Sequence, residues 1–465
     1  MSLKRKNLWE EYSVQETERM NDTVCRYKEF LDKGKTEREC IRYAVELAEK
    51  AGYKNLEDCI NAASSLKAGD KVYAVYNEKI LALYHIGSGD IEKGMNILGA
   101  HIDSPRIDVK QNPLYEANDF AYLDTHYYGG IKKYQWVATP LALHGVVIKK
   151  DGTRVNICVG EQEEDPVFCI TDLLVHLAQG QMEKTASKVI EGEDLDLLIG
   201  SRPIRIEEDK KEPIKENIVG ILKETYGIEE EDFLSAELEI VPSGRARDVG
   251  FDRSMIMAYG QDDRICAYTS LEALLSLQNT PDRTACCLLV DKEEIGSVGA
   301  SGMTSRFFEN STAELLALLG KASHLALRRT LAGSKMLSSD VSAGFDPHFQ
   351  DVFEAKNSAY LGKGVVFTKF TGIAGKASSN DANPEFIAAI RKIFDEKNIV
   401  FQTAELGRVD VGGGGTIAYI MAKYGMEVID CGLALLCMHA PYEISSKTDV
   451  HEAVRGYRTF IEYMK

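Results

Sequence analysis

A run of six apolar residues at 285–290, ACCLLV, is the feature that most constrains the fold of this 465-residue chain. Such a run is typical of a buried strand, and it leads directly into the acidic and glycine-rich segment 291–302. Ligands in open α/β sheets bind beyond the carboxyl ends of the strands. We therefore expect an α/β fold in which Glu293 and Glu294 lie at a strand end that carries chemistry.

An adjacent pair of glutamates has two interpretations. One glutamate can bind a metal ion while its neighbour works as a base, or both can be solvated in a surface turn, as most such pairs are. The pair does not decide between them. The rest of the chain has to supply partners for the functional interpretation.

Other predicted strands end in groups that bind metals. His101 and Asp103 follow an apolar run at 95–100, and residues two apart in extended chain face the same side. Asp262, Asp340 and His439 each follow a further apolar segment. A metal-bound imidazole usually needs a carboxylate or a carbonyl to fix its tautomer, and Asp103 is placed to provide one.

The candidate ligands are His101, Asp262, Glu294, Asp340 and His439. Two imidazoles and three carboxylates suit two zinc-like ions, whereas calcium or magnesium alone rarely require histidine; manganese and cobalt also accept this set. Two such ions lower the pKa of a shared water and polarise a carbonyl. The adjacent Glu293 would move the proton, so the chemistry implied is hydrolysis.

Local patterns predict several elements. Thr36 with Glu39 predicts a capped helix that ends near Gly52, and residues 71–76 and 80–85 predict a β-hairpin. The charged runs at 207–212 and 229–232 are interpreted as solvated loops. From about 107 to 246 strand-like runs dominate, so we predict a domain at 107–246 inserted between 1–106 and 247–465.

Composition narrows the class of protein. A net charge of −17 argues against nucleic acid, and no apolar run reaches the roughly 18 to 20 residues of a membrane span. The N-terminus at 1–6 is basic but precedes no apolar region of a secretory signal. Ten scattered cysteines without a Cys-x-x-Cys pair indicate buried thiols in a reducing compartment. We expect a cytoplasmic location.

The motifs together resemble the aspartyl aminopeptidase and vacuolar aminopeptidase I family of dinuclear zinc exopeptidases. The motifs that carry the resemblance are GAHIDSP at 99–105, DD at 262–263, DKEEIGS at 291–297, SD at 339–340 and MH at 438–439. They follow the family order over nearly the whole chain. Each motif is weak alone, and the set is specific.

The resemblance implies a role for each residue. Asp262 would bridge two ions, with His101 and Asp340 on one ion and Glu294 and His439 on the other. Asp103 would orient His101, and Glu293 would be the general base and then the acid. The resemblance also implies a mixed central sheet flanked by helices, an inserted, mostly-β dimerisation domain and a tetrahedral dodecamer.

The chain departs from the family pattern in the inserted domain. Residues 138–140, ATP, stand where the family commonly has Asp-Arg-Asp, and Asp172 stands where the family has a histidine that reaches a neighbouring subunit. These departures leave the preferred N-terminal residue open. Lys369 is either a contact for a substrate carboxylate or a solvated lysine. His176, four residues after Asp172, has no assigned role.

The leading hypothesis is a metal-dependent aminopeptidase that acts on short peptides. Two alternatives stay open at this stage. A related dinuclear hydrolase would cleave acylated amino acids, and a non-catalytic oligomeric scaffold would keep the fold without activity. The intact Glu293 and the complete ligand set speak against the scaffold.

Overall fold

The computed structural model describes residues 6–204, 211–372 and 374–465, which form two compact units. Unit 1 comprises Met1–Asp103, Ala246–Met438 and Glu443–Lys465, and unit 2 comprises Ser104–Arg245 and His439–Tyr442. The interpretation of the N-terminus at 1–5 and of the charged residues 207–210 lies outside the described residues. In the second acidic run Glu229, Glu230 and Glu231 are exposed, whereas Asp232 is buried and its carboxylate accepts the backbone N–H of Glu229 at 2.9 Å.

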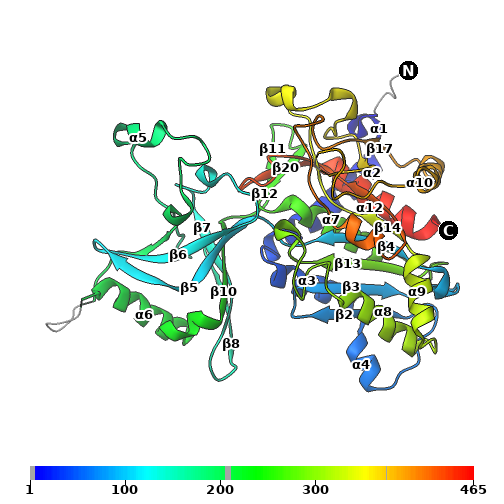
Figure 1. The fold of residues 1–465 in the computed structure, drawn as a ribbon, viewed down its shortest axis with the longest axis horizontal. Helices are drawn as coiled ribbons and strands as arrows, with labels where there is room; N and C mark the ends of the chain where they lie inside the picture. The colour runs from blue at the N-terminus through cyan, green and yellow to red at the C-terminus, as the bar shows by residue number, and fades with distance from the viewer. Residues whose placement is uncertain (1–5, 205–210, 373) are drawn as a thin grey trace. The chain divides into compact units, whose positions relative to one another are not determined.

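The central element of unit 1 is a mixed sheet of nine strands among the described residues (Figure 1). Its order is β1 (Lys54–Asn55), β2 (Lys71–Tyr76), β3 (Ile80–His85), β13 (Ala285–Val290), β4 (Asn96–His101), β14 (Lys335–Ser338), β18 (Glu427–Gly432), β16 (Val365–Thr368) and β17 (Phe401–Thr403). The predicted hairpin is β2–β3, and β13 is the predicted buried strand. Strands β13, β4, β14 and β18 run parallel, so their carboxyl ends share one edge.

Alternation along the strands explains why both faces of this sheet are covered. Cys287 and Leu289 of β13 pack into one apolar cluster, and Cys286, Leu288 and Val290 pack into the other. Side chains of a strand alternate between faces, so an all-apolar run requires helices on both sides. The sheet is therefore the middle of three layers.

One layer of helices contributes to the first cluster, and it comprises α2 (Val14–Lys33), α3 (Glu37–Lys50), α7 (Gln261–Leu275), α10 (Pro384–Glu396) and α12 (Lys447–Tyr463). The opposite layer comprises α4 (Leu56–Asn61), α8 (Phe307–Leu318), α9 (His324–Ala332) and α11 (Ala418–Ala422). The short helix α1 (Leu8–Glu11) precedes α2. Helix α3 confirms the predicted cap, because Thr36 and Glu39 form a reciprocal capping box.

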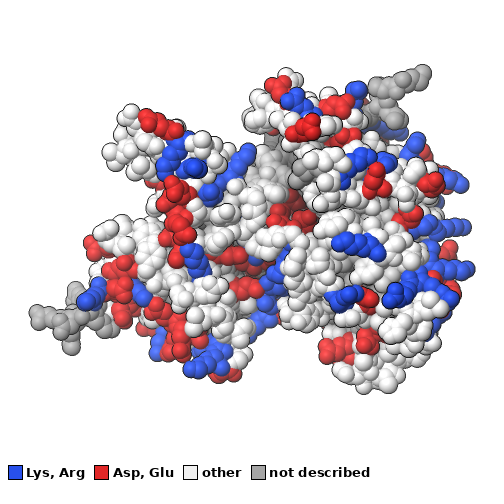
Figure 2. All heavy atoms as spheres, viewed as in Figure 1, with Lys and Arg blue, Asp and Glu red and all other residues white. Residues whose placement is uncertain are grey.

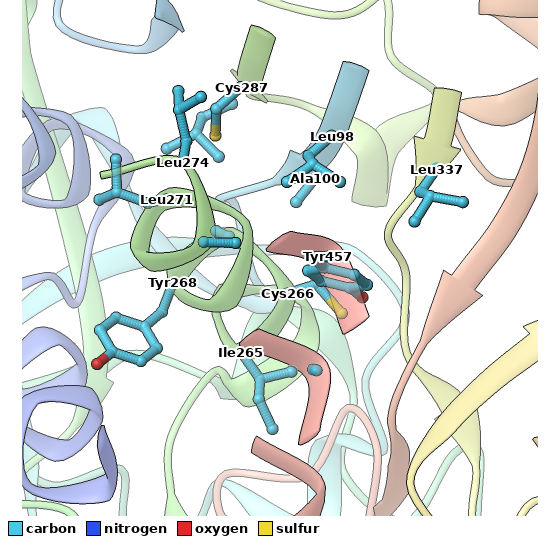
Figure 3. Packing of buried hydrophobic residues seen from close by; sticks show 14 of the residues in the cluster. Leu98, Ala100, Ile265, Cys266, Tyr268, Leu271, Leu274, Cys287, Leu337 and Tyr457 are labelled. Carbon is cyan, nitrogen blue, oxygen red and sulfur yellow. The ribbon is translucent and has the colours of Figure 1, made fainter. Parts of the chain in front are cut away.

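Helix α7 matters most for the site because its first turn contains the predicted ligand Asp262. Figure 3 shows Leu271 and Leu274 of α7 beside Cys287 of β13, and Cys266 beside Tyr457 of α12. A helix that packs against a sheet on one side and helices on another is apolar around most of its surface. The N-terminus of α7 is thus fixed by its own burial.

A second, smaller sheet in unit 1 holds the chain around this helix. Its order is β11 (Arg247–Val249), β12 (Met255–Ala258), β20 (Glu443–Ser446), β19 (Ala434–Leu436) and β15 (Ser342–Ala343). Strand β12 leads into Asp262, and β15 follows soon after Asp340. This sheet therefore connects two predicted ligands to the C-terminal segment.

Unit 2 is built on a six-stranded sheet with one longer helix (Figure 1). The order is β8 (Arg154–Val159), β7 (Leu141–Ile148), β10 (Ala236–Pro242), β5 (Arg106–Ala117), β6 (Phe120–Tyr128) and β9 (Leu197–Gly200), with every neighbouring pair antiparallel. Helix α6 (Pro213–Tyr226) packs against β5, β6 and β9, and α5 (Gln179–Met182) is a single turn.

The surface adds two observations. Figure 2 shows acidic and basic side chains interspersed on the visible face of each unit. Among the described residues, none of the helices combines the length and the apolar character that a membrane span needs.

Candidate functional site

The loop after β13 has a fixed path that presents the two glutamates. Lys292 is left-handed, with φ 70°, and Glu293 begins a 3-10 turn, Glu293–Ile295. A Cβ on Gly302 would lie 2.3 Å from the carbonyl oxygen of Ser297, so only glycine fits where the loop closes on itself. The sequence therefore folds this segment into one compact loop.

The carboxylate of Asp103, two residues after the end of β4, holds the same loop. Its two oxygens accept the backbone N–H groups of Glu293 and Glu294, each at 3.1 Å. Asp103 is buried, so these bonds are shielded from water. The contact sets the backbone position of both glutamates, and the sequence did not reveal it.

Asp103 also contacts His101, mainly through its backbone. The carbonyl oxygen of Asp103 lies 2.9 Å from Nδ1 of His101, whereas the nearer carboxylate oxygen is 3.4 Å away. When Nδ1 donates to this carbonyl, Nε2 keeps the lone pair that a metal ion needs. Nε2 of His101 points to Asp262, whose Oδ1 is 3.3 Å away.

Gln261, the residue before Asp262, is fixed by hydrogen bonds at both ends of its buried amide. Its oxygen accepts the hydroxyls of Tyr27 at 3.0 Å and Ser445 at 2.5 Å. Its nitrogen donates to the carbonyl of Glu443 at 2.6 Å. Since burial makes each unpaired polar group costly, this amide holds the chain in one conformation.

Two further residues complete the support of Asp262. The backbone N–H of Asp262 donates to the carboxylate of Glu443 at 3.0 Å. Arg264 is fully buried and donates to the carbonyls of Gly260 at 2.7 Å and Tyr259 at 2.8 Å. The backbone of Asp262 and of the residues just before it is therefore bonded within unit 1.

The structure brings several predicted site residues of unit 1 together. The ligand atoms of His101, Glu293 and Glu294 all lie within 4.8 Å of one another. Those of His101, Asp263 and Asp340 do so as well. Asp263 was not predicted as a ligand. The sequence predicted its neighbour Asp262 instead, because two adjacent aspartates cannot be told apart as ligands from their positions alone.

Charge crowding marks these residues. Burial, and next the carboxylate of Asp263, raises the pKa of Asp340 well above its usual range. Burial also raises the pKa of Asp263 strongly. Burial opposes the charged form of His101, but hydrogen bonds to Asp103 and Asp262 hold its pKa well above the usual value.

Asp430 of β18 is a further buried carboxyl that the sequence did not indicate. Burial raises its pKa to about 7, while the hydroxyls of Thr416 and Ser338 lower it. Ser338 ends β14, two residues before Asp340, so Asp430 lies close behind this part of the site. A single aspartate inside an apolar strand is the signal that could have identified it.

His439 belongs to unit 2, with the segment His439–Tyr442. Its Nδ1 lies 2.9 Å from the carbonyl oxygen of Gly130, the last residue of a Tyr-Gly-Gly stretch at 128–130. As in His101, a bond from Nδ1 to a carbonyl would leave Nε2 to bind a metal. Its place among the other ligands stays a prediction.

The chain is similar to known proteins over most of its length. A family model described as aminopeptidase I zinc metalloprotease (M18) matches residues 30–461. The probable M18 family aminopeptidase 1 of Clostridium acetobutylicum is 59% identical over 456 residues, which cover 98% of each chain. The chain belongs to the M18 family.

Solved structures agree with this assignment. The crystal structure of the M18 aminopeptidase of Thermotoga maritima has a TM-score of 0.94 and 44% identity, covering 99% of this chain and 100% of that one. The mApe1 dodecamer of S. cerevisiae has a TM-score of 0.76 at 20% identity, covering 95% and 97%. At that identity the likeness is one of fold.

Membership confirms three predictions: the family resemblance, the α/β fold class and the assignment to peptide hydrolases. The family description also supports zinc as the metal. The acylated amino acid hydrolase and the inactive scaffold were the alternatives, and membership in an aminopeptidase family favours neither.

The residues of this M18 chain fit a metal. Imidazole nitrogen and carboxylate oxygen are ligands that zinc prefers, and His101 has its other nitrogen bonded to a carbonyl. Buried carboxylates repel one another when ionised, and buried charges are normally paired or coordinate a metal. A divalent cation would provide that compensation beside His101, Asp262 and Asp340.

The sequence left open whether Lys369, Asp172 and His176 contact the substrate. The Lys369 ammonium contacts the carboxylate of Asp381, which also accepts Lys376 at 3.0 Å, so Lys369 is already ion-paired. Asp172 in unit 2 accepts the side-chain amide of Gln181 at 3.0 Å. His176 is exposed in a single 3-10 turn.

Proposed function

We propose that this M18 aminopeptidase removes N-terminal residues from short peptides with Glu293 as the proton-transfer group. The observation that carries the proposal is the contact of Asp103 with the backbone of Glu293 and Glu294. One carboxylate thereby fixes two neighbouring glutamates that start from the same loop. Two adjacent carboxylates held in this way are suited to different tasks.

We assign the metal ligands as the sequence predicts. His101 and Asp340 would hold one ion, Glu294 and His439 the other, and Asp262 would be shared. The 3.3 Å approach of Asp262 to Nε2 of His101 supports the shared position. Zinc is the expected metal, and cobalt or manganese would suit the same ligands. Bound there, two divalent ions would lower the pKa of a water and polarise the peptide carbonyl.

Glu293 performs the proton transfers in this proposal. Its carboxylate accepts a proton from the attacking water while the new C–O bond forms. It then delivers that proton to the peptide nitrogen as the C–N bond breaks. The 3.1 Å bond from its backbone N–H to Asp103 keeps the side chain from moving away with the loop.

Replacement of Glu293 by glutamine tests this role. Glu293→Gln keeps the size of the side chain but removes its basicity, so we expect kcat to fall by about 10²- to 10⁴-fold. Zinc content should stay at the wild-type value, because the five assigned ligands are unchanged. Rates would be measured with leucine p-nitroanilide, and zinc by atomic emission of the purified protein.

Glu18→Gln is the matched control, since Glu18 is an exposed glutamate on α2. It should change neither the rate nor the zinc content. Unchanged hydrolysis by Glu293→Gln would exclude Glu293 as the proton-transfer group. A simultaneous loss of zinc would instead show that Glu293 helps to bind the metal.

We further propose that the chain works as a homo-oligomer, with a tetrahedral dodecamer as the expected assembly. Support comes from a row of exposed apolar side chains in unit 2. Leu173, Leu174, Val175 and Leu177 are 49–71% exposed. Exposed apolar clusters of this kind usually mark protein contacts. The mass of the purified enzyme in solution, measured by light scattering, distinguishes a monomer or dimer from twelve copies.

The cytoplasm is the proposed location. All ten cysteines are free thiols, and seven of them are at least partly buried. Buried thiols without disulfides are typical of proteins in a reducing compartment. Fractionation of cells that produce the protein would contradict this proposal if the enzyme were recovered outside the cytoplasm.

A further inference from the structure

Unit 2 contains an apolar cavity that the proposed peptidase activity does not use. It has a volume of about 710 Å³ and lies between α6 and the strands β7, β8 and β10. Its walls include Val147, Ile157, Ile218, Leu222 and Leu238. Pockets for small ligands have volumes of roughly 300 to 1,000 Å³ and mostly apolar walls. The cavity is therefore large enough for a ligand.

The cavity exists because α6 covers the sheet loosely. Ile214 is the buried residue of α6, while Ile221 is 48% exposed. Phe120 and Val167 at the rim are 41% and 53% exposed. Atoms that line a void lack partners on one side and lose dispersion energy. A molecule that fills this space restores those contacts and covers the rim.

One end of the cavity is polar and negatively charged. Asp165 lines it, and one oxygen of its carboxylate accepts the backbone N–H groups of Gly160, Glu161 and Gln162 at 3.0–3.2 Å. Hydrogen bonds from these N–H groups, that of Gln162 first, hold the pKa of Asp165 below its usual range. The carboxylate is therefore ionised at neutral pH.

Tyr226, at the C-terminus of α6, lies at the same end. Burial, and next the carboxylate of Asp165, raises the pKa of the Tyr226 hydroxyl. A carboxylate and a phenol hydroxyl at the end of an apolar chamber accept hydrogen bonds from a cation. Asp165 is the charged residue among the described residues that line the cavity, so its carboxylate repels an anionic head group.

We propose that this cavity binds a small amphiphilic amine, with its apolar body between α6 and the sheet and its ammonium group at Asp165 and Tyr226. The charge of the polar end decides between classes of ligand. An alkylammonium matches it, a neutral alcohol of equal length gains only the apolar contacts, and a carboxylate is repelled. The inference uses unit 2 alone and does not depend on the peptidase mechanism.

Three eight-carbon probes test the proposal on the full-length protein: octylamine, octanol and octanoate. Isothermal titration at pH 7.5 should give one site per chain, with octylamine bound most tightly and octanoate least. We expect octylamine to bind about 1.5-fold to 5-fold more tightly than octanol, the contribution of a partly exposed ion pair. Asp165→Asn should remove this preference and leave octanol unaffected.

Two neighbouring residues of β7 provide matched variants. Val147 is buried and lines the cavity, whereas Ile148 is 38% exposed and faces the other side of the sheet. Val147→Trp should fill the chamber and abolish binding of all three probes, and Ile148→Trp should bind them as the wild type does. Val147→Phe is the milder replacement if the tryptophan variant does not fold.

The results separate the proposal from its competitors. No binding to the wild type, equal binding by Val147→Trp, or equal affinity for octanoate and octylamine would overturn it. If the wild type binds no probe and Val147→Trp changes the mass of the assembly, the cavity holds part of a second copy, and the proposal is wrong. The ordered affinities together with loss in Val147→Trp would support it.

Discussion

The sheets of the two units bury their faces differently. In unit 1 both faces of the nine-stranded sheet are covered, and β13 is buried along its whole length. In unit 2 one face is covered loosely by α6, which leaves a cavity of about 710 Å³. Dense packing fixes the position of a side chain, whereas loose packing leaves space for another molecule.

Polar groups show the same contrast. Around Asp262, the buried amide of Gln261 is bonded at both ends, and the carboxylate of Glu443 accepts the backbone N–H of Asp262. In unit 2, Asp165 is held by backbone N–H groups and stands at the edge of open space. A site for catalysis needs the first arrangement, because a small displacement of a reacting group is costly. A site that captures apolar molecules tolerates the second.

The largest expected difference between the two units is the loss of unfolding free energy when one leucine in each is replaced by alanine. Leu288 is fully buried in β13, so Leu288→Ala should lower the free energy of unfolding by ~2–5 kcal/mol. Leu222 borders the cavity and already lacks partners, so Leu222→Ala should cost less than ~1 kcal/mol. Urea unfolding would measure both.

The two tryptophans allow each unit to be followed separately, since Trp9 lies in unit 1 and Trp136 in unit 2. Each variant would be measured with the other tryptophan replaced by phenylalanine. Equal costs for the two leucines would mean that the cavity is filled in solution. The contrast in packing would then be lost.

Removal of the Gln261 amide is expected to have the next largest effect. Gln261→Leu leaves the carbonyl of Glu443 and the hydroxyl of Tyr27 without their partner, which should cost ~1–3 kcal/mol of stability. Zinc affinity should fall by about 10- to 100-fold, because the support of Asp262 is lost. Competition with a chromophoric chelator would measure the affinity.

Gln278→Leu, at an exposed position, is the control and should leave zinc affinity unchanged. Gln261→Glu is a second variant of the same size that cannot donate to the carbonyl of Glu443. If both Gln261 variants bind zinc as tightly as the wild type, the network has a structural role only. The position of Asp262 would then depend on the packing of α7 alone.

Local patterns explain how much of the fold was predictable. The uninterrupted run of apolar residues at 285–290 identifies β13, and the spacing of Thr36 and Glu39 identifies the start of α3. The carboxyl ends of neighbouring parallel strands lie at the same edge of a sheet. His101 ends one such strand and Glu294 follows its neighbour, so they could be predicted to lie near each other. These inferences use neighbours in sequence or a general rule of sheets.

The supporting contacts could not be predicted in the same way. Asp262 and Glu443 are 181 positions apart, and Asp103 and Glu293 are 190 apart. Nothing in either sequence segment indicates that a carboxylate will bind a backbone N–H of the other. The cavity of unit 2 arises from how loosely α6 packs, which depends on the tertiary fold and not on the helical pattern.

The last expected effect is a dependence of stability on pH, and it concerns Asp291, the residue after β13. Burial raises its pKa to about 7, whereas an aspartate in the unfolded chain titrates near ~3.9. Between these values the native state holds a proton that the unfolded state has lost, so stability falls as pH rises. Asp291→Asn removes this titration. Its unfolding free energy relative to the wild type should rise by up to ~1.4 kcal/mol per pH unit from pH 4 to 7 and then level.

Asp165 of unit 2 is the matched control for this titration. Backbone hydrogen bonds, that of Gln162 first, lower its pKa, so it is ionised in both states over the same interval. Asp165→Asn should therefore show no slope between pH 5 and 7. Urea unfolding of both variants and the wild type at several pH values would measure the difference. If the unfolding free energy of Asp291→Asn relative to the wild type did not change with pH, Asp291 would be ionised in the folded protein. Its surroundings would then stabilise the carboxylate enough to offset the effect of burial.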